Sequence, residues 1–455
     1  MTITPPVVLS QVNIGEWDAY TSPLEIRSVT LKGDSIISAT GGGLLIKSQD
    51  RFTTLTTIDG IYGVDLSSLA IDNYDNIWIG GSSPNGFIQL YNLDQGSIEV
   101  FDYGLSEITH FYFDNETAYA CFIDGQDVGF MKFIFSSGEW SYRDIYRNFP
   151  VEIEKITGFE ILETISSQEK NIFLATNVGL LVGDVSTNLK DPNNWKREFC
   201  CFNEGSVKAM TNYNNGFAFI YNESDNQPAF YYIYPSELSF LFTELEISPP
   251  IEFQQMLFDK DNYLWGIKNK MIYSERTGFS PMVQSKYLND IIVGFEQEII
   301  IGTNLGLKSI NDNMEIFSFV PNAPASSKFT ALEVLNDGRL VAASSNGLSI
   351  KDFDGWRNIL EVKINESLNI NEKYNYDEFI ADTIPYDFGD AVSDIEQGPD
   401  GLVYVGIEGT YPTFSNPDRI GGGILVIDID DAENISVIDT TILSYYTSNS
   451  SNRPY

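Results

Sequence analysis

The chain has 455 residues, of which 43% are hydrophobic and 13% aromatic, enough for a large packed core and too many for a disordered polypeptide. Its 27 basic and 64 acidic side chains give a formal net charge of −37, which would repel a phosphate backbone and argues against a nucleic-acid partner. No run of about 18 apolar residues is present, so the sequence predicts no transmembrane helix.

The N-terminal residues 1–13 contain a short apolar patch, Val7–Leu9, followed by Ser10 and Gln11. The patch lacks a basic segment before it and is too short for a complete signal peptide, although it is similar to the end of one. We interpret residues 1–13 as the remnant of an export signal and expect the true N-terminus to lie upstream of Met1. Because residues 447–455 form a polar stretch that closes no further repeat, we expect the chain to be a fragment at both ends.

A hairpin pattern is clearest at residues 72–91. Ile77–Ile79 and Phe87–Tyr91 are runs of β-branched and aromatic residues, and they flank a turn that ends in Asn85 and Gly86. Two such runs around an Asn-Gly turn predict a β-hairpin.

The same hairpin occurs nine times along the chain. Its second run begins at Gly43, Gly86, Gly129, Gly179, Ala229, Met271, Gly306, Gly347 and Gly423. Gly43 and Gly86 are 43 residues apart, as are Gly86 and Gly129, and Gly306 and Gly347 are 41 apart. A period of roughly 40 to 50 residues built from short strands is typical of four-stranded propeller blades.

Each copy also contains the two remaining strands of a blade. An apolar run such as Ser68–Ile71 precedes the hairpin, and an aromatic-tipped run such as Ser97–Phe101 or Glu139–Tyr142 follows it. No apolar period of 3.6 residues extends over a helical length. The sequence therefore predicts an all-β fold.

The ends of the ring are predicted from one further match. Residues 14–20 resemble the outermost strand of a blade, so we expect them to complete the last blade by pairing with the seventh hairpin at 299–310. Residues 315–319 would then start a second ring. The predicted fold is a seven-bladed β-propeller over residues 14–312, followed by about two blades of a second, incomplete propeller over 313–455. The alternative is one irregular β-structure that contains all nine hairpins.

Two long excursions interrupt the last blades. The insertion 364–390 is acidic and rich in aromatic residues, and long loops in compact repeats are often functional. We predict a partner-contact loop formed by Tyr374, Tyr376, Phe379 and Tyr386. A second excursion covers residues 408–422. The simpler alternative for both is structural decoration without a binding role.

The sequence contains one histidine, His110, on a predicted innermost strand. We predict that it lines the channel; a plain hydrogen-bonded core residue is the simpler alternative. One histidine cannot build a histidine-based metal site, and Cys121, Cys200 and Cys201 lack the spacing of a zinc site. We therefore predict no catalytic residues, no cofactor and no metal.

Aspartates near the tight turns could suggest calcium loops. Asp72, Asp75, Asp259 and Asp261 lack the regular alternation and the closing glutamate of such a loop. Hydrogen bonds from the turn backbone to the aspartate side chain explain them more simply.

The segments Asp75–Gly80, Thr176–Leu180 and Ile301–Leu307 resemble the two-component-regulator propeller repeat. The order of motifs from Ile14 to Leu44 is similar to the N-terminal propeller of the PorZ-type proteins of the type IX secretion system. That resemblance implies two seven-bladed propellers, a C-terminal sorting β-sandwich, and export to the periplasm or outer surface of a Gram-negative bacterium. It implies no ligand site that can be placed on particular residues here.

The expected function is a non-enzymatic scaffold that binds a protein or cell-surface glycan. Two alternatives stay open. The chain could be the sensory ectodomain of a hybrid two-component histidine kinase, or a propeller lyase or glycosidase that uses channel carboxylates. The enzyme alternative predicts a cluster of carboxylates with perturbed pKa values in the channel mouth.

Overall fold

The computed structural model describes residues 19–163, 170–197, 205–214, 216–223, 230–234, 243–245, 251–285, 288–344, 347–359, 361–365, 383–387, 392–407, 419–420, 423–429, 436–442 and 445–446. Within these ranges the chain consists of β-strands and three short 3₁₀-helices, η1 (Thr57–Asp59), η2 (Pro192–Asn194) and η3 (Glu275–Thr277). None of these helices is long and apolar enough to span a bilayer. The predicted all-β fold is confirmed.

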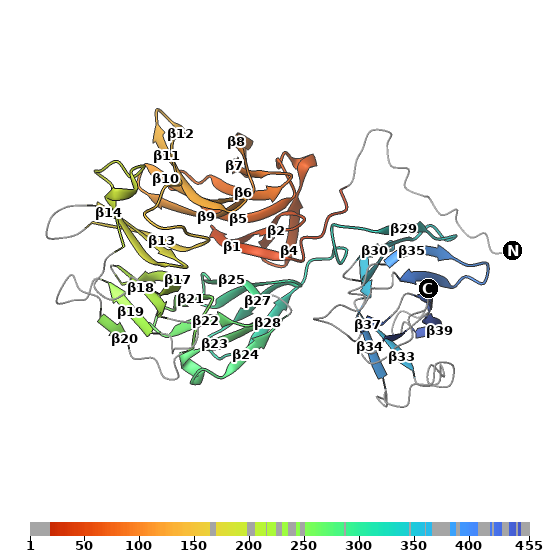
Figure 1. The fold of residues 1–455 in the computed structure, drawn as a ribbon. Coiled ribbons are helices and arrows are strands. Elements are labelled where there is room, and N and C mark those ends of the chain that lie inside the picture. Colours follow the sequence, from red (N-terminus) through yellow and green to blue (C-terminus); the bar gives the residue numbers. More distant parts are fainter. Residues whose placement is uncertain are drawn as a thin grey trace.

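Seven four-stranded antiparallel sheets follow one another along the chain and form the first unit, coloured from red to green in Figure 1. Strands pair in chain order within each sheet. The sheets are sheet 1, β1 (Ile26–Lys32), β2 (Ser35–Thr40), β3 (Gly43–Ser48) and β4 (Arg51–Leu55); sheet 2, β5 (Asp65–Ile71), β6 (Ile77–Ser83), β7 (Gly86–Asn92) and β8 (Gly96–Leu105); sheet 3, β9 (Glu107–Asp114), β10 (Thr117–Asp124), β11 (Asp127–Ser136) and β12 (Glu139–Tyr146); sheet 4, β13 (Ile156–Glu163), β14 (Lys170–Thr176), β15 (Gly179–Asp184) and β16 (Trp195–Lys196); sheet 5, β17 (Ser206–Tyr213), β18 (Gly216–Asn222), β19 (Phe230–Tyr234) and β20 (Thr243–Leu245); sheet 6, β21 (Gln255–Phe258), β22 (Leu264–Lys268), β23 (Met271–Ser274) and β24 (Pro281–Gln284); and sheet 7, β25 (Leu288–Val293), β26 (Ile299–Thr303), β27 (Gly306–Ile310) and β28 (Ile316–Phe319). All seven predicted hairpins of this region are the second and third strands of these sheets.

The glycine that begins the third strand of several sheets has a positive φ, which other residues rarely adopt. The φ of Gly43 is 120°, and a Cβ atom there would lie 2.4 Å from the carbonyl oxygen of Leu55. The hydroxyl of Thr40 closes the same turn by donating to the carbonyl oxygen of Gly43 over 2.7 Å. The turn between the second and third strands therefore explains the small residue that recurs in the sequence.

The core of the first unit consists of apolar layers between neighbouring sheets. The second strand of a sheet contributes to two apolar layers, because its alternate residues face opposite sides of the sheet. In β26, Ile299 and Ile301 pack toward sheet 6, and Ile300 packs toward sheet 1. The layer between sheets 7 and 1 includes Ile26 and Val29 of β1. Consecutive first strands contact one another from β1 to β25, and β25 contacts β1. The seven sheets thus form a ring with their first strands on the inside.

The seam between sheets 7 and 1 differs from the prediction. We expected residues 14–20 to complete the last blade, but Ile316–Phe319 pairs with β27 and supplies the fourth strand of sheet 7. The prediction that residues 315–319 start the second ring is therefore wrong. The observed pairing uses a tight turn in which Asn311 Oδ1 accepts the N–H of Glu315 over 2.9 Å, whereas strand exchange would close a loop of about 300 residues. Residues 14–18 lie outside the described part of the chain.

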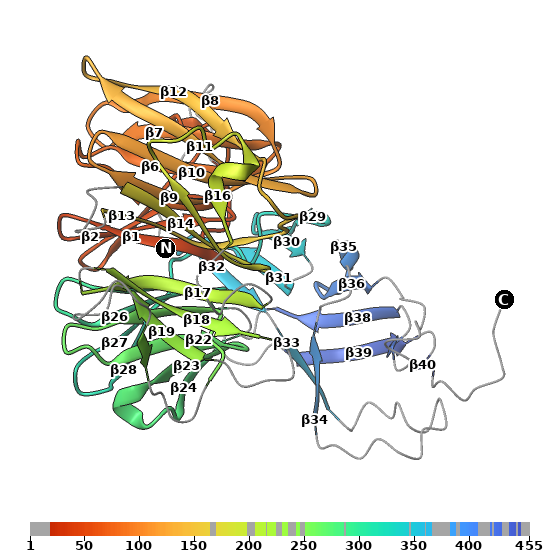
Figure 2. The ribbon, with the colours of Figure 1, turned by 60° about the vertical axis from the view of Figure 1, so that its left-hand side comes forward.

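The remaining described strands form a second unit, coloured teal to blue, which lies beside the first in Figures 1 and 2. One apolar layer between its two large sheets includes Val341, Ile350, Val405 and Leu425. Sheet 8 contains β29 (Ala331–Val334), β30 (Leu340–Ser344), β31 (Gly347–Lys351) and β32 (Trp356–Ile359); sheet 9 contains β35 (Val392–Gln397), β36 (Val403–Ile407), β38 (Gly423–Asp428) and β39 (Ser436–Ile442); two small sheets pair β33 (Glu361–Asn365) with β34 (Thr383–Asp387) and β37 (Arg419–Ile420) with β40 (Tyr445–Tyr446).

Candidate functional site

The first strands of sheets 1–7 are termed the inner strands. Because every sheet is antiparallel and begins at its inner strand, two sets of loops meet at the end where the inner strands begin: the loops between second and third strands, and those that join successive sheets. This end is termed the mouth. Near it the pairing of six inner strands with their second strands skips one residue, which forms a β-bulge; the skipped residues are Arg27, Ser67, Thr109, Thr157, Lys208 and Asn289.

The bulged side chains tie neighbouring inner strands together. Four of them donate a hydrogen bond to a main-chain carbonyl oxygen of the next inner strand: Arg27 to Leu66 over 3.2 Å, Ser67 to Ile108 over 2.6 Å, Thr157 to Val207 over 2.6 Å and Asn289 to Ile26 over 2.7 Å. The last of these bonds crosses the seam between sheets 7 and 1. The mouth is therefore lined by polar side chains on a rigid frame, the arrangement that a binding surface requires.

Charged groups of both signs surround this polar frame. The Arg27 guanidinium contacts Asp65 at 2.6 Å and Glu25 at 3.3 Å. Burial and the nearby Asp65 raise the pKa of Glu107, an effect that Arg27 partly opposes. On sheet 5, Lys208 pairs with Glu252 at 3.3 Å. The mouth thus offers paired charges rather than one strong field.

His110 lies on β9, directly after the bulged Thr109, and its pairing partner on the second strand is Cys121. Its side chain is exposed although it belongs to an inner strand. The inner strands around His110 reduce its hydration, and this desolvation lowers its pKa. The positive charge of Lys155 lowers the pKa further, by a smaller amount. The lowered pKa favours the neutral imidazole, and the role of His110 in lining the channel stays a prediction.

Three carboxyl groups on inner strands have raised pKa values: Glu107 on β9, Glu160 on β13 and Asp290 on β25. Each is held by a different set of neighbours. Among the residues that the structure describes, no three His, Cys, Asp or Glu side chains come close enough to hold a metal ion. The lyase or glycosidase alternative therefore stays a prediction.

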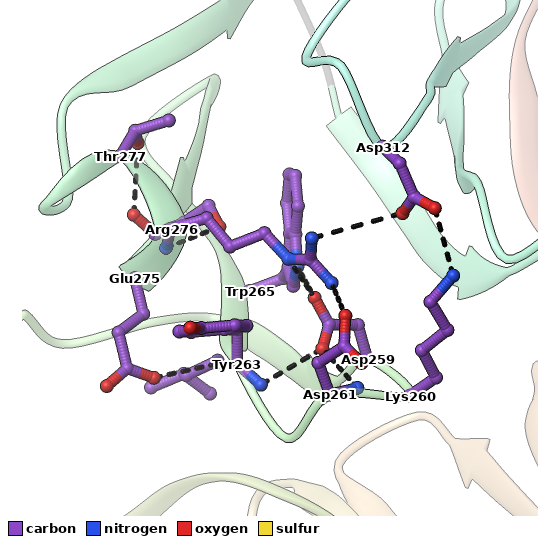
Figure 3. A network of polar contacts seen from close by, with 11 residues as sticks. Asp259, Lys260, Asp261, Tyr263, Trp265, Glu275, Arg276, Thr277 and Asp312 are labelled. Carbon is purple, nitrogen blue, oxygen red and sulfur yellow. Dashed lines mark hydrogen bonds and ion pairs between the residues drawn. The ribbon is translucent and has the colours of Figure 1, made fainter.

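The aspartates considered as calcium ligands are occupied by protein donors. Asp259 Oδ1 accepts the N–H groups of Asp261 and Tyr263 over 2.9 and 3.0 Å, and Oδ2 accepts the Trp265 indole over 2.9 Å and Arg276 over 2.7 Å (Figure 3). Asp72 is bound in the same way by its own turn and by tryptophan indoles. These contacts match the turn interpretation, and they leave neither carboxylate free for a cation.

The predicted partner-contact loop lies mostly outside the described residues. Tyr374, Tyr376 and Phe379 belong to residues 366–382, of which nothing is described. Tyr386 lies on β34, opposite Val362 of β33. The base of the insertion is therefore a β-hairpin, and its role in binding stays a prediction.

A groove of about 300 Å³ lies where the two units meet. The rings of Tyr20 and Trp356 meet edge to face there, with centroids 5.6 Å apart. The N–H of Ser22 donates to the hydroxyl of Ser327 over 2.8 Å. Tyr20 thus contacts sheet 8, and Ser22 contacts the connection between the units. The groove is a second candidate contact surface that the sequence did not indicate.

The bulges were not predicted from the sequence, although the sequence contains a pattern that indicates them. An apolar residue that becomes buried is followed directly by a polar one at the start of several inner strands, as in Leu66-Ser67, Ile156-Thr157 and Val207-Lys208. Strict alternation would place those polar residues in an apolar layer, and a bulge removes the conflict.

No protein-family model matches this chain, and no curated protein sequence matches it. Solved structures are similar to it. PorZ, described as an essential bacterial surface component of the type IX secretion system of Porphyromonas gingivalis, superposes with a TM-score of 0.59 at 14% identity, over 95% of this chain and 53% of PorZ. The extracellular domain of a hybrid two-component system from B. thetaiotaomicron gives a TM-score of 0.44 at 15% identity, over 95% of this chain and 60% of that domain.

The WD40 propeller domain of Doa1 covers 66% of this chain and 98% of its own length, with a TM-score of 0.46 at 11% identity. This chain spans about half the length of PorZ. At such identities the likeness to PorZ concerns the fold. The chain has a β-propeller architecture that resembles PorZ, as the repeat motifs of the sequence predicted.

Proposed function

We propose that this chain is an exported, non-enzymatic β-propeller scaffold that binds a protein or cell-surface glycan partner through its mouth. The frame of bulged residues carries this proposal, because its hydrogen bonds hold polar side chains at fixed positions at one end of the ring. The setting that we infer from the likeness to PorZ is the surface of a Gram-negative bacterium, in type IX secretion.

Charge also supports a binding role. The net charge of −37 favours a partner with a basic surface and opposes one rich in phosphate. Glu160, Asp290 and Arg27 on the inner strands each bind a different protein partner, an arrangement that suits a scaffold better than an enzyme.

We further propose that sheets 1–7 are the seven blades of a complete propeller and that the second unit belongs to a second ring. By strand register, Leu332 and Val334 of β29 correspond to Val29 and Leu31 of β1. Val29 is 4% exposed because sheet 7 covers it, whereas Leu332 and Val334 are 60% and 66% exposed. The face of sheet 8 that carries Leu332 and Val334 is thus apolar and exposed, like a face on which another blade would pack.

Site-specific photo-crosslinking would test the binding proposal. Lys155 is exposed just before β13 at the mouth, and Asp34 is exposed in the β1–β2 turn at the opposite end of the ring. A photoreactive benzoylphenylalanine would replace one or the other in cells of the source organism. We expect position 155 to capture outer-membrane secretion components and position 34 to capture none.

Other results of that experiment would contradict the proposal. Equal capture from both positions would remove the mouth as the binding surface. A kinase on the same polypeptide at the inner membrane would favour the sensory alternative. Release of a cleaved glycan from a purified candidate substrate would favour the enzyme.

A further inference from the structure

The ring closes without strand exchange in the described part of the chain. The four strands of sheet 7 come from one continuous stretch, β25 to β28, and those of sheet 1 from another, β1 to β4. No strand is shared across the seam between these described sheets, so contacts between the sheets must hold it. The apolar layer at the seam supplies part of them, and Lys47 of β3 adds another by lying 4.2 Å from the ring centre of Phe319 on β28.

Residues 20–25, which precede β1 and are termed the strap, cross this seam at the mouth. The carbonyl oxygen of Leu24 accepts the N–H of Gly306, in the turn between β26 and β27 of sheet 7, over 2.7 Å. The hydroxyl of Thr21 donates to the carbonyl oxygen of Gly42, in the turn between β2 and β3 of sheet 1, over 2.5 Å. The strap therefore binds one turn on each side of the seam.

The strap fits closely against sheet 1. Ser22 is 5% exposed, and a Cβ atom on Gly42 would lie 2.3 Å from the carbonyl oxygen of Ser22. The nearest atoms to a Cβ on the neighbouring Gly41 would be the side-chain ends of Arg27 and Glu25, at 3.2 Å. Position 42, unlike position 41, thus leaves no room for a side chain while the strap is in place.

The outer end of the strap contacts the second unit. The ring of Tyr20 meets that of Trp356 on β32 at 5.6 Å, and the N–H of Ser22 donates to the Ser327 hydroxyl over 2.8 Å. Trp356 is itself fixed to the connection between the units, because its N–H donates to Asn322 Oδ1 over 2.7 Å. One segment of six residues therefore joins sheet 7, sheet 1 and the second unit.

The second unit is held from both sides of the seam. The covalent connection, residues 320–330, continues from β28 of sheet 7, whereas the strap continues into β1 of sheet 1. Sheets 1 and 7 cannot move apart unless the strap leaves either the turn at Gly306 or the second unit.

We propose that the strap locks the ring in place of strand exchange and that the second unit anchors the outer end of the strap. Closure of the seam and orientation of the second unit then form one coupled equilibrium, and by linkage a change that loosens either one loosens the other. This device does not depend on partner binding at the mouth.

Two variants of the full chain disturb the strap from opposite ends. Tyr20→Ala combined with Ser327→Ala removes contacts with the second unit and changes no residue of sheets 1 and 7. Gly42→Ala displaces the strap from sheet 1 and changes no residue of the second unit.

Each variant has a matched control. The control for the double variant is Tyr103→Ala combined with Ser326→Ala. Tyr103 is 46% exposed, as Tyr20 is, and its ring lies 5.0 Å from that of Tyr142 within the first unit. The Ser326 hydroxyl accepts the N–H of Lys328 over 3.0 Å within the connection. Gly41→Ala is the control for Gly42→Ala.

Hydrogen–deuterium exchange measures the seam. In both strap variants we expect the amides of β1 and β25 to exchange about 10-fold faster than in the wild type, because one hydrogen bond and one aromatic contact together contribute roughly that factor. The amides of β6 and β7, away from the seam, should keep their rates, and both controls should match the wild type.

Electron–electron double resonance measures the orientation of the second unit. Spin labels are placed at Asp50→Cys, in the exposed turn between β3 and β4, and at Phe353→Cys, which replaces a side chain that is 90% exposed. Cys200→Ser and Cys201→Ser remove the other thiols except the buried Cys121. We expect one narrow distance distribution for the wild-type strap and the controls, and a broader one for both strap variants.

Uncoupled results would overturn the proposal. The double variant might broaden the distance distribution while β1 and β25 keep their protection, or Gly42→Ala might expose the seam while the distribution stays narrow; either result would mean that the strap does not link the two. Controls with the same effects as the strap variants would also overturn it. If Gly42→Ala does not fold, the double variant decides alone, since it removes only partly exposed groups.

Discussion

Trp140 in sheet 3 donates its indole N–H to Asp72 Oδ2 over 2.8 Å, although the two residues are 68 positions apart. The same oxygen accepts the indole N–H of Trp78 over 3.1 Å, and the two indole rings meet edge to face at 5.2 Å. One aspartate thus fixes the turn of its own blade and the packing of the next blade.

Replacing Asp72 with alanine should destabilise the first unit by roughly 2–4 kcal/mol, because two buried indole N–H groups and two turn N–H groups lose their acceptor. Urea unfolding measures the loss. Asp34→Ala, in an exposed turn, is the control and should change the free energy of unfolding by less than about 0.5 kcal/mol. An Asp72→Ala variant as stable as that control would show that the shared acceptor contributes nothing.

Arg276 joins sheets 6 and 7 through Asp259, Asp261 and Asp312 (Figure 3). Arg276→Met should cost roughly 1–3 kcal/mol at neutral pH, since Asp259 would lose its charge-assisted partner. The pKa of Asp259 is lowered because hydrogen bonds from Arg276 and Trp265 outweigh its burial. A lowered folded pKa gives stability that is present above the unfolded value of 3.8 and lost as the pH falls through the folded pKa, so the difference between variant and wild type should shrink in acid.

Arg143→Lys, an exposed arginine of β12, is a control for the general loss of a guanidinium group. Chemical unfolding at neutral pH and again below a pH of about 3 measures both effects. A stability difference that stays constant over this range would mean that Arg276 acts through packing rather than through the carboxylate.

Gly302 leaves room for the seam. A Cβ atom on it would lie 2.7 Å from Ile26 Cγ2, so Gly302→Ala should destabilise ring closure by about 1–3 kcal/mol. The corresponding glycine of sheet 9 is Gly406, whose Cβ would meet Ser393 Oγ at 3.2 Å and other atoms only beyond that distance. Gly406→Ala is therefore the matched control and should be nearly neutral; equal effects of the two substitutions in thermal unfolding would contradict a packed seam at Ile26.

Cys121 is 2% exposed, and burial raises the pKa of its thiol to about 12. In a variant with Cys200→Ser and Cys201→Ser, a thiol reagent at a pH of about 8 should react with Cys121 only as fast as the chain opens, since the thiolate is the reactive form. The rate of modification can be compared with the unfolding rate from urea jumps. Rapid modification of the native protein would show that sheets 3 and 4 separate more easily than their packing indicates.

The hairpins were predictable because their determinants are local. Asn85 with Gly86 and the positive φ of Gly43 lie within a few residues of the strands that they join. The turns that begin at Asp72 and Asp259 are equally local, since backbone N–H groups two and four residues on bind the carboxylate.

The seam could not be read from the sequence in the same way. Residues 14–20 and Ile316–Phe319 have similar composition, and both could serve as a fourth strand of sheet 7. The short connection to β27 decides between them, because closing a tight turn costs less conformational entropy than bringing together two distant ends of the chain.

The sequence by itself determined the repeat, the hairpin within each of sheets 1–7 and the alternation that makes apolar layers, because these depend on neighbours in the chain. Only the tertiary structure decided which carboxyl groups become shared between sheets, as Glu160 and Asp290 are, and which polar residues line the mouth. Those features depend on strands brought together from distant parts of the chain, and burial at such contacts, rather than residue type, sets hydrogen bonding and pKa.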